Sequence, residues 1–395
     1  MTGEVGLALV LLIGAGLLTR SLEKILDVDP GFDAGGLLDF NVSLSPEVTA
    51  SAEKAHAVVR ELTERVGAIS GVQAASVDLG AFPFEHDSEA PFWPEEKPKP
   101  ANHSDWPLAL IYFVGPDYFQ TMRIPLIRGR VFTNEDTPSS KPVIVVDEDL
   151  ANAAFPGENP LGKQLNFGGS GPSQEIIGVV GHVKQSGLDE NTRSSVRYQS
   201  YSSVDQFSGP LLPIAASNMS LLVRTDRPAA SLVEPIRKEL SALDPTAPVY
   251  GVEAMREIIG ETLAERRFSM VLLGSFASFA LLLAAIGIYG VFSHQVAQRT
   301  HEIGVRMALG ARPRDVLRMI LEQSGTLALG GIAMGVVASI GLTRLMASML
   351  FGVSATDPVT FLTVVSILLT VALMACWVPA RRAMRVDPMV ALRHE

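Results

Sequence analysis

The chain has 395 residues, of which 47% are hydrophobic and 19% are charged, and its formal net charge is −10. Residues 1–265 have a net charge of −16, whereas residues 266–395, whose basic residues are all arginines, have a net charge of +6. The arginine excess is modest and lies at the ends of apolar segments, which favours a role in membrane topology and argues against nucleic-acid binding. The single cysteine, Cys376, excludes a disulfide framework.

Four apolar runs without Asp, Glu, Lys or Arg are the strongest feature of the sequence; they cover residues 5–19, 268–298, 323–343 and 358–380. A membrane-spanning helix needs about 20 mostly apolar residues, and the first run reaches this length only when residues 1–4 are counted. One such run could be a buried core helix, but several, each bounded by charge, predict four transmembrane helices. The first run has no positive segment before it, which favours an uncleaved anchor over a signal peptide.

Between the first two runs, the sequence predicts a mixed α/β domain. Residues 38–44 alternate like a half-buried strand, and residues 55–69 have the apolar spacing of a helix. The other predicted strands are 72–79, 109–114, 143–146, 175–183, 220–224 and 247–252, with a further helix at 229–243. Six prolines in residues 80–107 predict an irregular surface loop, for which contact with a partner is the alternative role.

The second apolar run is predicted to begin as a stalk outside the membrane. Residues 253–267 contain no proline and one glycine, Gly260, and they continue into Phe268 without a turn signal. A continuous helix over 253–293 would be about 60 Å long at 1.5 Å per residue, about twice what a bilayer needs. A break near Gly260 is the alternative.

Arginines in the short loops predict the orientation of the helices. Nine of them lie either between the second and third runs or after the fourth, whereas residues 347–357 contain no Lys or Arg. The positive-inside rule therefore places the middle loop, the C-terminus and the N-terminus inside, and the α/β domain outside. Arg20 and Lys24 oppose this orientation because they follow the first run on its outer side.

The sequence contains no motif that indicates an enzyme. Residues 157–163 match GxxxxGK, but position 164 is Gln where a phosphate-binding loop needs Ser or Thr, and Pro160 removes a backbone N–H. A turn before a strand at 163–167 is the better interpretation. There is no HExxH pair or GxSxG elbow, and the acidic residues 147–149 are interpreted as the solvated start of a helix. We therefore expect no catalytic, cofactor-binding or metal-binding residue.

Small residues take the place of charged ones in the middle of the apolar runs. The absence of central charges argues against an ion or proton pathway. Gly287, Gly290 and the pair Gly331 and Gly335 allow helices to approach closely. We expect most of these contacts within one subunit, and some with a partner.

Three segments of the membrane part carry a family resemblance. Residues 298–311 read QRTHEIGVRMALGA, which resembles the cytoplasmic-loop signature of MacB/FtsX-type permeases of ABC transporters. Residues 282–291 resemble the LAxxGxYGV end of the second helix of these permeases, and residues 379–392 resemble their PAxRAxxxxPxxAL tail. Residues 118–119, 129–130, 160–163 and 177–180 resemble the MacB-like periplasmic core domain. The resemblance covers nearly the whole chain, and residues 3–21 resemble the middle of duplicated orphan permeases, as if this chain were the second half of one.

The resemblance implies a permease in the bacterial inner membrane that acts by mechanotransmission. A partner ABC ATPase would bind the ATP, and a second permease unit would complete the assembly as a homodimer or a paired half. Efflux or export follows from this, with a periplasmic or outer-membrane partner possible and no nucleic acid involved. The alternative is a transport-inactive, FtsX-like signalling or scaffold protein that regulates periplasmic partners.

Together these features predict an α-helical membrane protein with four transmembrane helices and a large mixed α/β extracytoplasmic domain between helices 1 and 2. The predicted order is helix 1 (1–20), periplasmic core domain (21–252), stalk and helix 2 (253–293), cytoplasmic coupling loop (294–322), helix 3 (323–346), periplasmic loop (347–357), helix 4 (358–380) and cytoplasmic tail (381–395).

The coupling loop is the predicted docking site for the ATPase. Its apolar residues are numerous for a loop in water, and its glycines permit close backbone approach. The predicted docking residues are Glu302, Ile303, Gly304, Arg306, Met307, Leu309 and Gly310. The alternative, in which the arginines only set the topology and bind lipid phosphates, leaves Glu302 and Gly304 unexplained.

Overall fold

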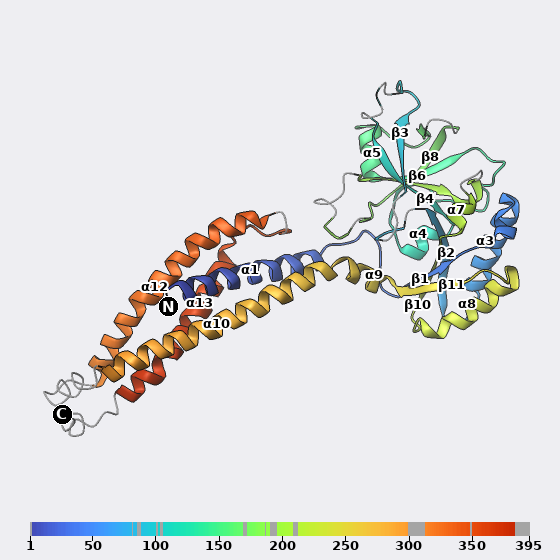
Figure 1. Cartoon of the computed structure of the whole chain (residues 1–395). Helices are drawn as coiled ribbons and strands as arrows, with labels where there is room; N and C mark the ends of the chain where they lie inside the picture. The colour runs from blue at the N-terminus through green and yellow to red at the C-terminus, as the bar shows by residue number, and fades with distance from the viewer. Residues whose placement is uncertain are drawn as a thin grey trace, which may run out of the picture. The chain divides into compact units, whose positions relative to one another are not determined.

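The computed structural model forms two compact units, which are drawn with their element labels in Figure 1. One unit comprises Met1–Asp27 and Ala264–Glu395, and the other comprises Val28–Leu263. The structure describes residues 2–80, 82–84, 88–99, 102, 106–168, 172–185, 187–189, 196–207, 212–298, 313–347 and 350–383.

The first lobe of the α/β domain is a ferredoxin-like sheet with two helices. Its strands pair in the order β11–β1–β10–β2, and every pairing is antiparallel. The elements are β1 (Leu37–Val42), α2 (Pro46–Thr49), α3 (Ala52–Gly67), β2 (Val72–Gly80), β10 (Met219–Thr225), α8 (Ala230–Leu243) and β11 (Val249–Ala254). This confirms the two predicted strand–helix–strand sets. They interleave because β10 lies between β1 and β2.

Helix α3 shows why the sequence folds in this way. The Ser51 hydroxyl accepts from Lys54 N at 3.5 Å and caps the first turn. Val59, Leu62 and Val66 follow one another at helical spacing, and all three are buried against the sheet. Each such side chain contributes about 1.5–3 kcal/mol by leaving water.

The second lobe is inserted between β2 and β10, and its strands close into a ring. The pairings run β4–β3–β7–β8–β6–β9, and β9 then pairs with β4 in parallel. The strands are β3 (Glu89–Pro94), β4 (Leu108–Val114), β6 (Val143–Asp147), β7 (Gln164–Phe167), β8 (Gln174–Val180) and β9 (Tyr198–Ser203), with β5 (Leu126–Gly129) beside β8. The short helices are α4 (Tyr118–Met122), α5 (Glu148–Ala154), η2 (Val204–Gln206) and α7 (Leu212–Ala216). Strand β4 also pairs with β2, so it belongs to both lobes.

Strand β3 corrects the prediction of an irregular loop over residues 80–107. Pro91 and Pro94 lie in this strand, which pairs with β4 and β7. Pro91 has no backbone N–H to donate, but its carbonyl oxygen accepts from Gly168 N at 3.0 Å, and the adjacent Phe92 N donates to Pro107 O at 3.0 Å.

Two further corrections concern the burial of aspartates in segments that were predicted to be partly exposed to solvent. Strand β1 was predicted to be half-buried, but Asp39, on its polar face, is 0% exposed. The predicted helix start at 147–149 is confirmed as α5, yet Asp147 is also fully buried. Its Oδ1 accepts from Leu150 N at 2.9 Å, and its Oδ2 lies 2.6 Å from His182 Nδ1. The predicted helix start therefore holds, and the solvated position is wrong for Asp147, whereas Glu148 is exposed and Asp149 is partly exposed.

The helical unit contains α1 (Thr2–Leu26), α10 (Ala264–Gln298), α12 (Pro313–Leu345) and α13 (Pro358–Ala383). Within the described residues, three segments are long and apolar enough to cross a membrane: Thr2–Leu26, Ala264–His294 and Pro358–Trp377. In α12, the side chains are described for the apolar segment Leu329–Leu345, which is shorter than these three segments.

The prediction of one continuous helix over 253–293 is wrong. The chain forms α9 (Met255–Thr262) and then α10, with Leu263 as a turn residue between them. Leu263 N donates to Gly260 O at 3.2 Å, so the break lies near the glycine that the alternative interpretation named. The physical reason is burial: Met255 and Ile258 belong to the hydrophobic core of the α/β domain, so α9 is part of that domain.

Candidate functional site

Helix α1 is the central element of the helical unit. It contacts α10, α12 and α13, and Figure 1 shows it among them. Leu9, Ile13 and Leu17 are at most 1% exposed and form the core with residues of the other helices. Half of the most apolar stretch of α1 is buried, which is a larger share than in α10 or α13.

Glycines bring α1 and α12 together. A Cβ atom on Gly335 would lie 3.0 Å from Gly6 Cα and 2.8 Å from Leu9 Cδ2, and one on Gly331 would lie 2.9 Å from Val5 Cβ. Only helices with very small residues at the contact approach so closely. The predicted packing role of Gly331 and Gly335 within one subunit is confirmed.

The two glycines of α10 differ. A Cβ atom on Gly287 would lie 2.7 Å from Glu4 Oε2 of α1, whereas no described atom lies within 4 Å of the corresponding position on Gly290. The exposed side of α10 is strongly apolar, with Phe268, Phe279 and Ile286 each at least 65% exposed. This face is available to lipid or to another helix.

An ion pair lies where α1 ends and α13 begins. The Arg20 guanidinium pairs with the Asp357 carboxylate, which also accepts from Thr360 N at 2.8 Å and from Thr360 Oγ1 at 2.7 Å. The Thr360 hydroxyl, followed by the Thr360 N–H and Arg20, holds the pKa of Asp357 below its ordinary value. Nearby, Phe351 N donates to Ser21 Oγ at 2.8 Å. The charge of Arg20, which opposed the predicted orientation, is therefore offset by Asp357.

The predicted ATPase-docking residues lie between α10 and α12. Helix α10 ends at Gln298 and α12 begins at Pro313. The residues concerned are Glu302, Ile303, Gly304, Arg306, Met307, Leu309 and Gly310, and they lie outside the described part of the chain. The docking site therefore stays a prediction.

Lys163 does not belong to a phosphate-binding loop. Its ammonium group pairs with the Glu158 carboxylate, lies 3.7 Å from Glu96 Oε2 and lies 4.7 Å from the centre of the Phe155 ring. Gly157 and Gly162 have positive φ angles of 74° and 80°, as in a loop that turns tightly before β7. The predicted turn before a strand is confirmed.

One group of possible metal ligands occurs among the described residues: Asp147, Asp149 and His182, whose ligand atoms lie within 4.8 Å of one another. These atoms already hold the fold together. Asp147 caps α5 and contacts His182, while Asp149 Oδ2 lies 2.9 Å from Arg197 Nη2. A guanidinium beside the carboxylate already neutralises the charge that a cation would need.

Two buried carboxyl groups escaped the sequence analysis. Asp39 on β1 and Asp78 on β2 are 0% and 2% exposed, and Tyr118 of α4 is also buried beside Asp78. Burial raises the pKa of Asp78 well above its ordinary value, and the charge of Asp39 raises it further. A strand pattern of alternating polar and apolar residues gives no signal that the polar face is covered.

Two family models match the chain. Residues 9–242 match the MacB-like periplasmic core domain, and residues 274–388 match the FtsX-like permease C-terminal domain.

Several known proteins are similar to this chain. The macrolide export ATP-binding/permease protein MacB of Syntrophobacter fumaroxidans is 26% identical over 74% of this chain and 48% of its own length. The uncharacterized ABC transporter permease YvrN of Bacillus subtilis is 28% identical over 72% of this chain and 70% of its own length. The crystal structure of the periplasmic region of MacB from Actinobacillus actinomycetemcomitans, at 19% identity, matches 61% of this chain and 98% of its own with a TM-score of 0.38.

This chain spans about half the length of the first MacB relative. Its MacB-like core-domain match covers residues 9–242, more than half of the 395 residues. Within the part of the chain that the structure describes, three helices long and apolar enough to cross a membrane and a large α/β domain accompany that match. The chain therefore belongs to the family of ABC transporter permeases with a MacB-like periplasmic core domain and an FtsX-like permease domain.

Proposed function

We propose that this protein is the membrane-spanning permease of a bacterial ABC system and that it carries out efflux or export by mechanotransmission. It spans the inner membrane four times, through α1, α10, α12 and α13, with the α/β domain outside. The arginine-rich segments after α10 and α13 and the arginine-free segment 347–357 support this orientation.

The connection between α9 and α10 is the observation that carries the proposal. Met255 and Ile258 of α9 are buried in the core of the α/β domain, and a single turn residue, Leu263, separates α9 from the apolar helix α10. A displacement of α10 would therefore act directly on a helix that is built into the outer domain. Hydrolysis of ATP by a partner ATPase at the inner end of α10 would supply this displacement.

The segment between α10 and α12 is the proposed docking site for that ATPase. Glu302 and Arg306 would form charge-assisted hydrogen bonds with it, and Met307 and Leu309 would enter an apolar groove. The exposed apolar face of α10 would adjoin lipid or a second permease unit, with Phe268, Phe279 and Ile286 at the contact.

Copurification tests the docking site. The wild-type chain, Glu302→Arg, Met307→Asp and the control Glu395→Arg would each be purified from the native membrane, and vanadate-sensitive ATP hydrolysis would be measured in each sample. Losing one partner of a desolvated interface pair costs about 2–5 kcal/mol, or roughly 30-fold or more in affinity. The two loop variants should therefore lose the ATPase, while the control, a charge reversal in the tail, retains it. Undiminished ATPase in both loop variants would refute docking at this loop.

A further inference from the structure

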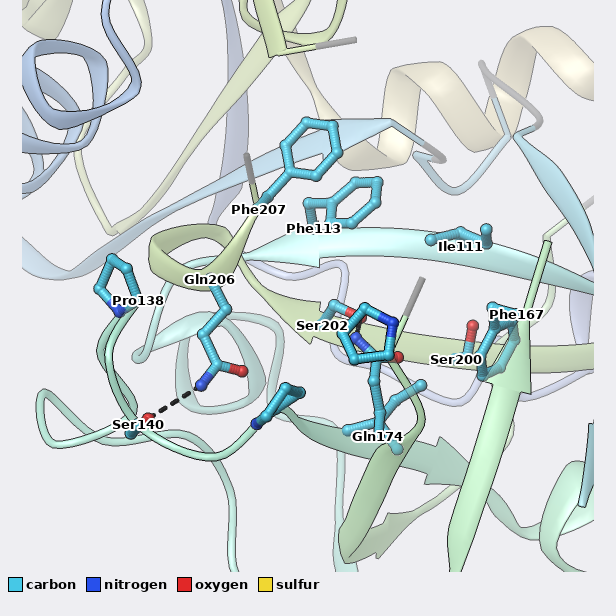
Figure 2. A pocket seen from close by; sticks show the side chains of 13 residues that line it. Ile111, Phe113, Pro138, Ser140, Phe167, Gln174, Ser200, Ser202, Gln206 and Phe207 are labelled. Carbon is cyan, nitrogen blue, oxygen red and sulfur yellow. Dashed lines mark hydrogen bonds between the residues drawn. The ribbon is translucent and has the colours of Figure 1, made fainter. Parts of the chain in front are cut away.

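A pocket lies at the mouth of the strand ring in the α/β domain. It has a volume of about 410 Å³, and its walls come from β4, β6, β7, β8 and β9 and from the segments that precede β6, precede β8 and follow β9. Figure 2 shows Phe207, Phe113 and Ile111 following one another along one side, with Gln206, Ser202 and Gln174 below them. The volume is within the range of about 300–1,000 Å³ that is typical of small-molecule sites, and barrel mouths are common positions for them.

The described residues that line this pocket are uncharged. None of its 13 residues is Asp, Glu, Lys, Arg or His. Phe113 and Phe207 stack with ring centres 3.8 Å apart and form an apolar wall. An ion that entered would lose its hydration without finding a countercharge, whereas a neutral molecule would lose much less.

The polar side of the pocket is largely fixed in place. Gln206 Nε2 donates to Ser140 Oγ at 2.9 Å and to Lys141 O at 3.0 Å, and its Oε1 accepts from Val143 N at 3.1 Å. On the other side, His56 Nε2 of α3 donates to Phe207 O at 2.8 Å. Because these bonds hold both walls, a ligand would meet a preformed site and little side-chain ordering would oppose its binding.

Among the described residues that line the pocket, two groups are free to recognise a ligand. Gln174 Nε2 donates to Ser202 Oγ at 3.3 Å, which leaves Gln174 Oε1 as an acceptor and the Ser202 hydroxyl proton for donation. The structure thus offers one acceptor and one donor beside an aromatic wall. This is the complement of an apolar body that carries a primary amide.

We propose that this pocket, the ring-mouth pocket, binds an uncharged amphipathic small molecule. The ligand has an aromatic or aliphatic body against Phe113 and Phe207, and its single amide or hydroxyl group bonds to Gln174 and Ser202. This site is independent of the proposed coupling to an ATPase, because every residue that forms it lies within the α/β domain.

Three probes of nearly equal size test the proposal: 4-phenylbutanamide, 4-phenylbutyrate and 4-phenylbutylamine. Their binding to the full chain in lipid nanodiscs would be measured by equilibrium dialysis at pH 7, with empty nanodiscs as the reference for partition into lipid. The neutral amide should bind at least about tenfold more tightly than the anion or the cation, because neither charge finds a partner. Equal binding of the three probes, or binding no greater than to empty nanodiscs, overturns the proposal.

Paired variants locate the site. Gln174→Phe should fill the pocket and abolish amide binding, whereas Gln164→Phe, on the adjacent strand β7 and outside the lining, should leave it unchanged. Ser202→Ala, which removes the donor with almost no change of shape, should weaken the amide about five- to tenfold and decides the matter if Gln174→Phe does not fold. Unchanged binding in Ser202→Ala, or equal losses in both phenylalanine variants, contradicts the assignment.

Discussion

The two units solve the problem of a stable interior in different ways. In the helical unit, α1 and α12 meet through glycines, and the ion pair between Arg20 and Asp357 lies beyond the apolar helix contacts. The α/β domain instead buries charged groups: Arg224 is buried and donates to Thr121 O at 2.6 Å and to Asp33 O at 2.6 Å. A lipid-exposed helix has no water to solvate a charge, so close backbone packing replaces polar networks there.

We expect the largest effect from a substitution that disrupts the glycine contact between α1 and α12. Gly335→Leu places a side chain where even a Cβ atom lies 3.0 Å from Gly6 Cα, and backbone atoms of a neighbouring helix cannot yield as a side chain can. We expect destabilisation of about 3 kcal/mol. Gly341→Leu is the matched control, since no described atom lies within 4 Å of a Cβ on this glycine of the same helix. The measurement is resistance of α12 to proteolysis in detergent, and equal cleavage of the two variants would mean that the contact does not matter.

The sequence predicted the helical unit far better than the ring lobe. Long charge-free runs identify spanning helices one at a time, and α1, α10 and α13 needed no knowledge of their partners. Strand β9 reads Tyr-Gln-Ser-Tyr-Ser-Ser and has no apolar pattern. It is nevertheless buried in the sheet, where it pairs with β4 and β6 from distant parts of the chain. Ala109 pairs with Tyr198 in this way, and no local signal specifies such a pairing.

The candidate sites also differ in whether local sequence predicts them. The docking loop was predicted from local residues and stays a prediction. The ring-mouth pocket escaped notice because its walls come from strands spread over about a hundred residues of chain. The pair of Arg20 with Asp357 joins residues at opposite ends of the sequence, and only the folded chain brings them together.

The second expected effect is a pH dependence of stability in the α/β domain, which comes from its buried carboxyl groups. Burial raises the pKa of Asp78 well above its ordinary value, so the folded α/β domain retains this proton to a higher pH than the unfolded chain, which releases it above about pH 4. Stability from this group is therefore present in acid and falls as pH rises through the interval between the two pKa values, by about 1.4 kcal/mol per pH unit. Asp78→Asn removes this loss, so the variant should be more stable than wild type at pH 7 and equal to it near pH 4.

Tryptophan fluorescence can follow this change in the α/β domain alone. In a Trp377→Phe background, the remaining tryptophans are Trp93 and Trp106, both of this domain. Asp117→Asn is the control, because Asp117 is exposed and its side chain makes no capping bond with α4. If wild type and Asp78→Asn show parallel midpoints of thermal unfolding from pH 4 to pH 7, the Asp78 carboxyl is ionised in the folded domain.

We expect the smallest effect from the ion pair between Arg20 and Asp357 in the helical unit. Asp357→Ala removes both the cap of α13 and the partner of Arg20, and we expect a loss of about 1 kcal/mol. Arg20→Gln removes the ion pair but leaves the cap. Because Arg20 is partly exposed, the loss of stability should be about 0.5 kcal/mol and should decrease as salt is added.

The pKa of Asp357 is lowered, so its contribution to stability is present above about pH 4 and disappears as pH falls through the folded-state pKa. This direction is opposite to that of Asp78. Fluorescence of Trp377, in a background with Trp93 and Trp106 replaced by Phe, reports on α13 during denaturant unfolding. If Arg20→Gln costs as much as Asp357→Ala at high salt, the ion pair rather than the cap stabilises this end of the helix.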